Sequence, residues 1–192
     1  AERNPELAAL ASEARGRASA VELARLAYVP DLAIGLDVPE VQAAAPSLRT
    51  SAQIVAGNSN WNTSVFGATP EFFEVRDWPL AEGRGFEAAD LAGSGKVAII
   101  GRTVVEQLFG GADAIDQTIR VKKVPLTVIG VLARKGQNSL GQDQDDTVVV
   151  PLSTFRNRIQ GTSGRLKRVG SINVKVRDGQ SMQAAEQGIR EL

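Results

Sequence analysis

Two short aliphatic runs separated by a long polar insert constrain the fold of this chain more than any other feature. The runs occupy residues 128–132 and 148–152, and the fifteen residues between them are rich in Gly, Gln, Asp, Asn and Ser. Such runs are typical of buried strands, and such an insert is typical of a loop at one end of a sheet. An ordered loop of this length is uncommon in a compact domain unless it has a function or is mobile.

Three aspartates, Asp143, Asp145 and Asp146, stand close together just before the second run. Calcium prefers such carboxylate oxygens, but the twelve-residue calcium loop does not fit here. Val148 occupies the position that requires glycine, and Thr154 the position of the bidentate glutamate. We therefore predict no metal site, and aspartates that face solvent or accept hydrogen bonds from loop amides.

The chain contains neither Cys nor His. Disulfides, thiolate nucleophiles, Ser-His-Asp triads and imidazole metal ligands are therefore excluded. Chemistry based on carboxylates alone stays open, as in glycoside hydrolysis. The acidic residues of the segment 71–90 are expected on surface helices and loops, however, so a carboxylate pair there is disfavoured. No cofactor is predicted for this domain.

Two short motifs resemble known signatures only superficially. Residues 93–97 read GSGKV, but a phosphate-binding loop needs Gly where Asp90 stands and Ser or Thr where Val97 stands. Residues 57–61 read GNSNW, which ends in Trp61 where a nucleophile elbow has glycine. Both are interpreted as turns.

The bulk composition is that of a water-exposed globular domain. Of the 192 residues, 43% are apolar and 23% are charged, and the formal net charge is zero. The length suffices to bury a core, and nucleic acid is not an expected partner because the basic excess is missing. No apolar run approaches the roughly 18 residues that span a bilayer, and the first residues do not predict a signal peptide.

Local patterns predict a mixed α+β fold. Residues 1–28 predict a helical lead-in. The first half of the chain predicts a hairpin over 41–56 and 58–68, a helix over 70–75 capped by Thr69, a loop over 79–86 and a helical turn over 87–91. The middle predicts a strand over 97–100, a helix over 102–109 ended by Gly110, and a hairpin over 118–121 and 126–132 with Pro125 in its turn. The last part predicts a strand over 147–150, a helix over 151–159, a strand over 169–176 and a helix from 182 to the end.

The charge is unevenly distributed along the chain. Residues 71–92 contain six acidic and two basic residues, whereas 152–178 contain seven basic residues and one acidic residue. Solvated faces are the default interpretation, and a contact with a subunit or partner through complementary charge is the more specific one. The candidate partner-contact residues are Gln142, Asp143, Gln144, Asp145, Asp146, Arg165, Lys167 and Arg168.

A series of motifs in this order resembles the periplasmic core domain of MacB-type (FtsX-like) ABC transporter permeases. The motifs are VQAAAP (41–46), VFGATPEFF (65–73), EGRGF (82–86), VAIIG (97–101), LFG (108–110), VIGVL (128–132) and, most specific, GQDQDD (141–146) followed by VPL (150–152). They extend over about residues 38–192. Residues 1–28 depart from the family, whose members usually leave their first transmembrane helix through an extended apolar segment.

The resemblance implies a periplasmic domain between two transmembrane helices of an inner-membrane permease. Family members form homodimers, bind ATP and Mg at a cytoplasmic nucleotide-binding domain, and work with a periplasmic adaptor protein and an outer-membrane channel. The resemblance also implies two lobes, a porter-like one from residues 29–57 and 151–192 and an inserted β-rich one from residues 58–150.

Several functions stay open at this point. A domain that relays ATP-driven conformational change to the expulsion of a periplasmic substrate is the leading expectation, and a lipoprotein-release permease is a variant of it. The alternatives are a stand-alone periplasmic module that binds a ligand or peptide, and a carboxylate-dependent enzyme.

Overall fold

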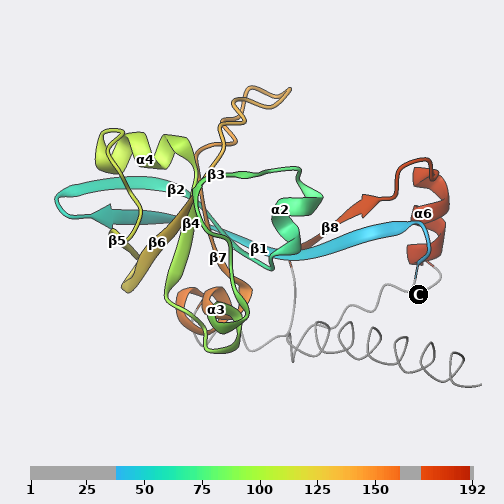
Figure 1. Ribbon diagram of the computed structural model, residues 1–192, viewed down its shortest axis with the longest axis horizontal. Helices are drawn as coiled ribbons and strands as arrows, with labels where there is room; N and C mark the ends of the chain where they lie inside the picture. The colour runs from blue at the N-terminus through green and yellow to red at the C-terminus, as the bar shows by residue number, and fades with distance from the viewer. Residues whose placement is uncertain (1–37, 161–169, 191–192) are drawn as a thin grey trace, which may run out of the picture. The chain divides into compact units, whose positions relative to one another are not determined.

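The computed structural model of the chain describes residues 38–160 and 170–190 (Figure 1). The predicted helical lead-in, residues 1–28, lies outside the described residues. The same holds for three of the candidate contact residues, Arg165, Lys167 and Arg168.

A long hairpin opens the described part. Strand β1 (Val41–Ala56) pairs antiparallel with β2 (Ser59–Ala68), in register from Ser47↔Ala68 to Ala56↔Ser59. Gly57 lies in the turn with a φ of 54°, a conformation that glycine adopts without steric cost. The predicted hairpin is confirmed, and so is its turn.

The remaining elements are short helices and strands. In chain order they are α2 (Glu71–Val75), β3 (Leu80–Gly83), α3 (Ala88–Ala92), β4 (Val97–Ile100), α4 (Arg102–Phe109), β5 (Thr118–Val121), β6 (Val124–Leu132), β7 (Thr147–Pro151), α5 (Leu152–Thr154), the π-helical turn η1 (Phe155–Ile159), β8 (Ser171–Val176) and α6 (Met182–Arg190). The mixed α+β class is therefore confirmed.

Six of the strands form a closed ring. The pairing order is β2-β7-β4-β6-β5-β1, and β1 pairs again with β2. Parallel pairs (β2 with β7, β4 with β6) and antiparallel pairs both occur. β3 adds to the edge of β6, and β8 extends β1 beyond the ring. Closure gives each of the six ring strands a paired neighbour on both sides, which protects their edges.

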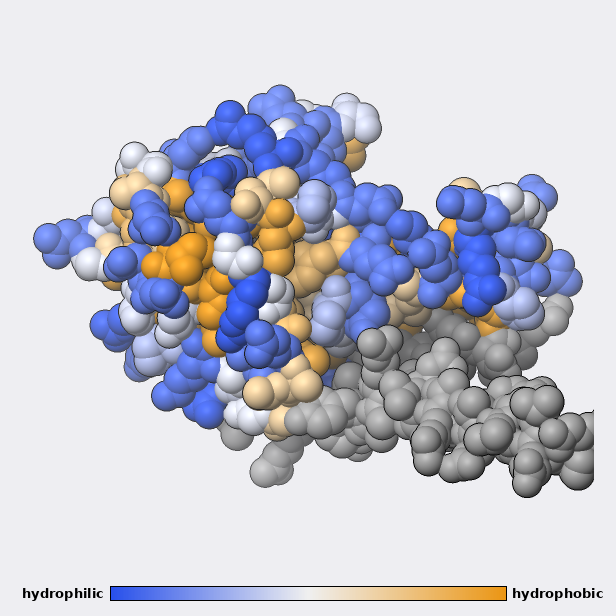
Figure 2. Space-filling view, viewed as in Figure 1, coloured by the Kyte–Doolittle hydropathy of each residue, from blue (hydrophilic) through white to orange (hydrophobic). Residues whose placement is uncertain are grey.

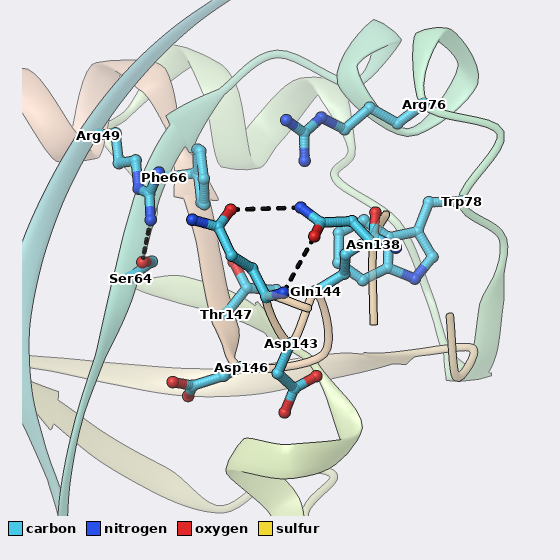
Figure 3. A pocket seen from close by; sticks show the side chains of 11 residues that line it. Arg49, Ser64, Phe66, Arg76, Trp78, Asn138, Asp143, Gln144, Asp146 and Thr147 are labelled. Carbon is cyan, nitrogen blue, oxygen red and sulfur yellow. Dashed lines mark hydrogen bonds between the residues drawn. The ribbon is translucent and has the colours of Figure 1, made fainter. Parts of the chain in front are cut away.

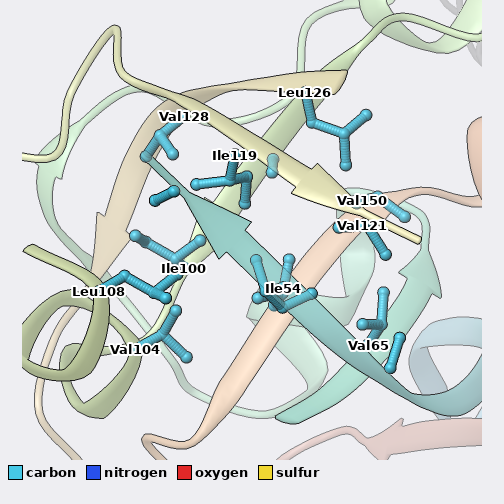
Figure 4. Close-up of a cluster of buried hydrophobic side chains, with 14 of the residues drawn as sticks. Ile54, Val65, Ile100, Val104, Leu108, Ile119, Val121, Leu126, Val128 and Val150 are labelled. Atoms are coloured by element: carbon cyan, nitrogen blue, oxygen red, sulfur yellow. The ribbon is translucent and has the colours of Figure 1, made fainter. Parts of the chain in front are cut away.

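The principal hydrophobic core fills the inside of this ring (Figure 4). Ile54 from β1, Val65 from β2, Ile100 from β4 and Ile119 from β5 are all fully buried in it. Helix α4 adds Val104, Val105 and Leu108, and the segment after β7 adds Leu152, Phe155 and Ile159. At about 25 cal/mol per Å² of buried apolar surface, these side chains are the main source of stability.

A second cluster lies on the other face of the same strands. Along β7, Val148 and Val150 join the inner core, whereas Val149 joins the outer cluster. This alternation follows from the two-residue period of a strand. Phe72 of α2 and Trp78 cover the outer cluster and are themselves buried.

Strand β1 changes partners at its midpoint. Its first half pairs with β8, ending at Pro46↔Ile172 and Ser47↔Ser171, and the pairing with β2 begins at Ser47. Pro46 has no backbone N–H to donate, so it is tolerated at this position, where β1 pairs with β8 but not yet with β2. Figure 1 shows β8 and α6 beside this first half of β1, outside the ring.

The division into two lobes at residues 57/58 and 150/151 stays a prediction. β1 contributes to the ring over its second half and to the β8 pairing over its first. Phe155 and Ile159, which were predicted in the porter-like lobe, pack into the core of the ring.

Four local predictions were wrong. Residues 80–83 form strand β3 and not a loop, because they pair with β6. Pro125 lies inside β6 opposite Arg120, so the turn is made by residues 122–123. The Thr69 hydroxyl accepts no capping hydrogen bond from the first turn of α2, whose N-cap is Pro70. The helix predicted over 151–159 divides into α5 and a π-helical turn in which Gln160 N–H bonds to Phe155 O at 2.8 Å.

Candidate contact site

The polar insert forms a projecting loop of residues 133–146 between β6 and β7, and we refer to it as the 133–146 loop (Figure 1). Asn138 shapes its tip. Asn138 Oδ1 accepts the backbone N–H groups of Leu140 at 2.9 Å and Gln142 at 3.0 Å, and its Nδ2 donates to Gln142 Oε1 at 3.2 Å. Asparagine side chains stabilise turns by such local hydrogen bonds. The tip is therefore internally braced.

Asp145 anchors the base of the loop. Its side chain is buried, with a relative exposure of 3%, and accepts the backbone N–H groups of Lys135 at 2.8 Å and Gly136 at 3.0 Å. A buried carboxylate requires such partners, because an unpaired one would cost several kcal/mol. Asp145 therefore joins the two ends of the loop, and its carboxylate is buried there.

Asp143 and Asp146 are also used inside the molecule. Asp143 is exposed, yet its carboxylate accepts Thr103 Oγ1 at 2.7 Å and Asp145 N–H at 2.9 Å. Asp146 accepts the indole N–H of Trp61 at 2.9 Å. The prediction that the aspartates bond to loop amides is confirmed for Asp143 and Asp145, and Asp146 bonds to a side chain instead.

The exposed part of the loop differs from the predicted contact set. Gln142 and Asp143 are exposed and Gln144 is half-buried. The most prominent side chain is Leu140 at the tip, which is 83% exposed. Sequence reasoning missed it because a single leucine in a polar insert gives no periodic signal. Whether any of these residues contacts a partner stays a prediction, as it does for Arg165, Lys167 and Arg168.

A polar cavity of about 360 Å³ lies beside the loop (Figure 3). Its lining residues come from β1, β2, the segment after α2, the 133–146 loop and the start of β7. They are Arg49, Ser64, Phe66, Arg76, Trp78, Asn138, Gln142, Asp143, Gln144, Asp146 and Thr147.

Two arginines stack on one aromatic ring in this cavity. The guanidinium carbons of Arg49 and Arg76 lie 5.3 and 5.5 Å from the centre of the Phe66 ring, and Arg76 also lies 4.8 Å from the centre of the Phe72 ring. Burial, together with the positive charge of Arg49, lowers the pKa of Arg76 below its usual value. Two like charges are thus held near each other at a cost, which aromatic stacking partly offsets.

The face seen in Figure 2 is predominantly hydrophilic. Apolar residues reach the surface in patches over the sheet, with hydrophilic residues between them. A contact on this face would be of mixed polarity, as interfaces that form and dissociate commonly are.

Residues 38–160 and 170–190 contain neither a metal-binding cluster of side chains nor a membrane-spanning helix. No three acidic side chains there are grouped so that they could hold a metal ion. No helix in this part of the chain has both the length and the apolar character needed to cross a bilayer.

The fold and the braced loop define a sheet-based domain with a projecting polar loop. The chain belongs to the family described as the MacB-like periplasmic core domain, whose profile matches residues 7–192. The resemblance noted in the sequence is thereby confirmed, and so is the class: a periplasmic core domain of an ABC transporter permease, which is a non-catalytic kind of domain.

Curated relatives agree with this assignment. The chain is 42% identical over 132 residues to the macrolide export ATP-binding/permease protein MacB of Syntrophobacter fumaroxidans, covering 68% of the chain and 18% of that relative. It is 33% identical over 162 residues to the pyoverdine export ATP-binding/permease protein PvdT of Pseudomonas aeruginosa, covering 84% of the chain and 24% of that relative. The chain thus spans about a fifth to a quarter of the length of these relatives.

Solved structures show the same fold. The periplasmic region of MacB from Actinobacillus actinomycetemcomitans superposes with a TM-score of 0.70 at 26% identity, over 85% of this chain and 71% of that one. The extracellular domain of the ABC-type transporter YknZ from Gram-positive bacteria superposes with a TM-score of 0.64 at 18% identity, over 80% of this chain and 74% of that one, which is a likeness of fold alone.

Proposed function

We propose that this domain belongs to a MacB-like export permease and relays ATP-driven conformational change to the expulsion of a substrate from the periplasm. In this proposal ATP and Mg bind at an associated cytoplasmic nucleotide-binding domain. The partners are a second permease subunit, a periplasmic adaptor protein and an outer-membrane channel. Family membership and the export functions in the names of the relatives support the proposal.

The observation that carries the contact role is the construction of the 133–146 loop. A loop that docks a partner loses less conformational entropy on binding when it is ordered beforehand. Asp145 secures the base with two hydrogen bonds, and Asn138 closes the tip with three. The leucine presented at that tip, Leu140, is 83% exposed and supplies an apolar anchor.

Site-specific cross-linking in the full-length permease tests the loop. The domain has no cysteine, so Leu140→Cys introduces a single thiol into this part of the protein. With a cysteine-reactive photo-cross-linker on residue 140, we expect a cross-link to the co-expressed adaptor. Met182→Cys on α6 is the matched control, because Met182 is another exposed apolar residue, at 78%, on a different element.

The substitution Leu140→Glu should reduce both the cross-linked complex and the export rate while leaving ATP binding unchanged. Equal cross-linking from positions 140 and 182, or full export by the Leu140→Glu permease, would remove the loop from the proposed contact.

The basic part of the chain, residues 152–178, offers a second contact that can be tested separately. Reversing the charges of Arg165, Lys167 and Arg168 should weaken adaptor pulldown, and the wild-type affinity should fall as salt rises. Pulldown that is unaffected by the reversal would exclude this segment and leave the loop as the candidate.

Two alternatives lead to different outcomes in the same system. A lipoprotein-release permease would release a lipoprotein in vesicles and would export no small substrate. A stand-alone ligand-binding module would occur in a gene without flanking transmembrane segments. Determining the complete reading frame and assaying both substrate classes distinguishes these functions.

A further inference from the structure

The cavity beside the 133–146 loop has an unbalanced charge. Within residues 38–160 and 170–190, neither Arg49 nor Arg76 has a carboxylate oxygen within 4.0 Å. We propose that Arg49 and Arg76 form a binding site for an oxyanion, a carboxylate or phosphate group carried by a small ligand. This site is distinct from the contact role of the loop tip.

The two arginines differ from the described arginines that are paired with a carboxylate. Arg84 pairs with Asp90 at 2.7 Å, and Arg102 pairs with Glu82 at 2.5 Å. In these pairs a nearby acid neutralises the arginine. Arg49 and Arg76 instead both lie over the ring of one phenylalanine, Phe66, and the charge of Arg49 acts repulsively on Arg76. A bound anion would remove that repulsion.

The acids that line the cavity do not neutralise the pair. Asp143 is engaged by Thr103, and Asp146 by Trp61. Figure 3 shows both carboxylates directed away from the two guanidinium groups, which lie on the opposite side of the cavity. The negative charges are therefore fixed in other hydrogen bonds.

The guanidinium groups are held in place by interactions that leave most of their donors free. Arg49 Nη2 donates to Ser64 Oγ at 2.8 Å, and the face of Arg49 stacks on Phe66. Arg76 lies over the Phe66 and Phe72 rings, whose centres are 5.6 Å apart. Stacking uses the faces of a guanidinium, whereas hydrogen bonds to an oxyanion use its edge. The site is thus prepared for bidentate binding before a ligand arrives.

Neutral polar groups complete the cavity. Gln144 lines it from the loop, and Thr147 lines it from the start of β7. Thr147 is 2% exposed, and its hydroxyl has no hydrogen-bond partner among the described residues. Amide and hydroxyl donors beside two arginines favour an oxygen-rich anion over an apolar ligand.

Isothermal titration of the full 192-residue chain with two probes, citrate and inorganic phosphate, at constant ionic strength tests this site. We expect saturable binding of at least one probe. Arg49→Gln and Arg76→Gln should each weaken it at least about tenfold, the loss expected when one charge-assisted pair is removed. Arg120→Gln is the matched control, because Arg120 is an exposed strand arginine away from the cavity lining and should bind like the wild type.

Each outcome is decisive. Binding of citrate alone identifies a carboxylate ligand, binding of phosphate alone identifies a phosphate ligand, and both support the site. Arg76→Lys retains the charge and should recover part of the affinity, which separates binding from folding. If Arg76→Gln fails to fold, Arg49→Gln decides, because Arg49 is exposed. Absence of saturable binding of either probe, or equal weakening by Arg120→Gln, would overturn the proposal.

Discussion

Gly101 lies against the main chain of Asp145, so closely that a Cβ atom on Gly101 would stand 2.1 Å from the carbonyl oxygen of Asp145. Gly101 N–H also donates to Thr147 O at 2.9 Å. The end of β4 and the base of the 133–146 loop are therefore packed backbone to backbone. Only glycine allows this approach.

The substitution Gly101→Ala should therefore destabilise the domain. Because the clashing atom is a backbone oxygen and cannot rotate away, the loop base must shift, and we expect a loss of about 2–3 kcal/mol in the free energy of unfolding. Urea denaturation measures it. Gly85→Ala is the control, since its Cβ would meet nothing closer than 3.8 Å and should change stability by less than about 0.5 kcal/mol. An equal loss of stability in Gly101→Ala and Gly85→Ala would contradict the close approach of Gly101 to Asp145.

Replacing Asp145 by alanine should release the loop. Two backbone N–H groups would lose their buried acceptor, which costs about 1–3 kcal/mol. Arg134 and Lys135 provide trypsin sites at the loop base, so cleavage there should become faster than in the wild type. Asp178→Ala removes an exposed aspartate and should leave the cleavage rate unchanged. A loop equally resistant in the Asp145→Ala chain would show that the anchor is dispensable.

Phe155 closes the inner core beneath β2. It is 2% exposed and packs so tightly on Gly67 that a Cβ on that glycine would lie 2.3 Å from Phe155 Cβ. Phe155→Ala should cost about 3–5 kcal/mol, since the cavity is enclosed by a sheet that cannot collapse freely. Thermal and chemical unfolding of Phe155→Ala and of Phe86→Ala, which removes a half-buried ring, give the comparison. The prediction fails if the Phe86 substitution is the more damaging.

Asp90 should make stability depend on pH in the acidic range. Burial favours its neutral form, but hydrogen bonds from Arg84 Nη1 at 2.7 Å and Glu87 N–H at 2.9 Å outweigh burial and lower the pKa of Asp90 below its usual value. A lowered native pKa contributes stability above the unfolded-state pKa of about 3.9, and that contribution is lost as the pH falls through the native pKa.

The variant Arg84→Gln tests this dependence. The pKa of Asp90 should rise, and stability at neutral pH should drop by less than about 1 kcal/mol, because Arg84 is largely exposed. The stability curves of variant and wild type should converge below the native pKa. NMR titration of the Asp90 carboxyl measures the shift, and an unchanged titration curve would rule out the Arg84 contribution.

Local elements were predictable where one residue pattern decided them. The β1–β2 hairpin follows from alternation around Gly57, and the end of α4 follows from Gly110, which adopts the left-handed conformation. β3 was not predictable, because Leu-Ala-Glu-Gly has no strand signal and becomes a strand only by pairing with β6. Closure of the ring was missed for the same reason, because it depends on the pairing of β1 with β5, two strands that are far apart in the sequence.

The candidate site was predicted in part. The 133–146 loop follows from composition, but the internal use of its aspartates depends on Thr103 and Trp61, which are distant in sequence. Arg49 and Phe66 are register partners of the hairpin and could have been paired once its turn was placed. Arg76 could not, because the packing of α2 against the sheet positions it.

The continuity of strand β1 affects how the domain can move. Its backbone runs without interruption from the β8 ladder, past Pro46, into the ring at Ala56. An extended, hydrogen-bonded chain resists lengthening far more than a loop does, so no hinge separates α6 from the ring along this path. We expect β1 to transmit force along its length. A pull on its Val41 end would move the ring as one rigid piece, because the strand between Val41 and the ring would not lengthen.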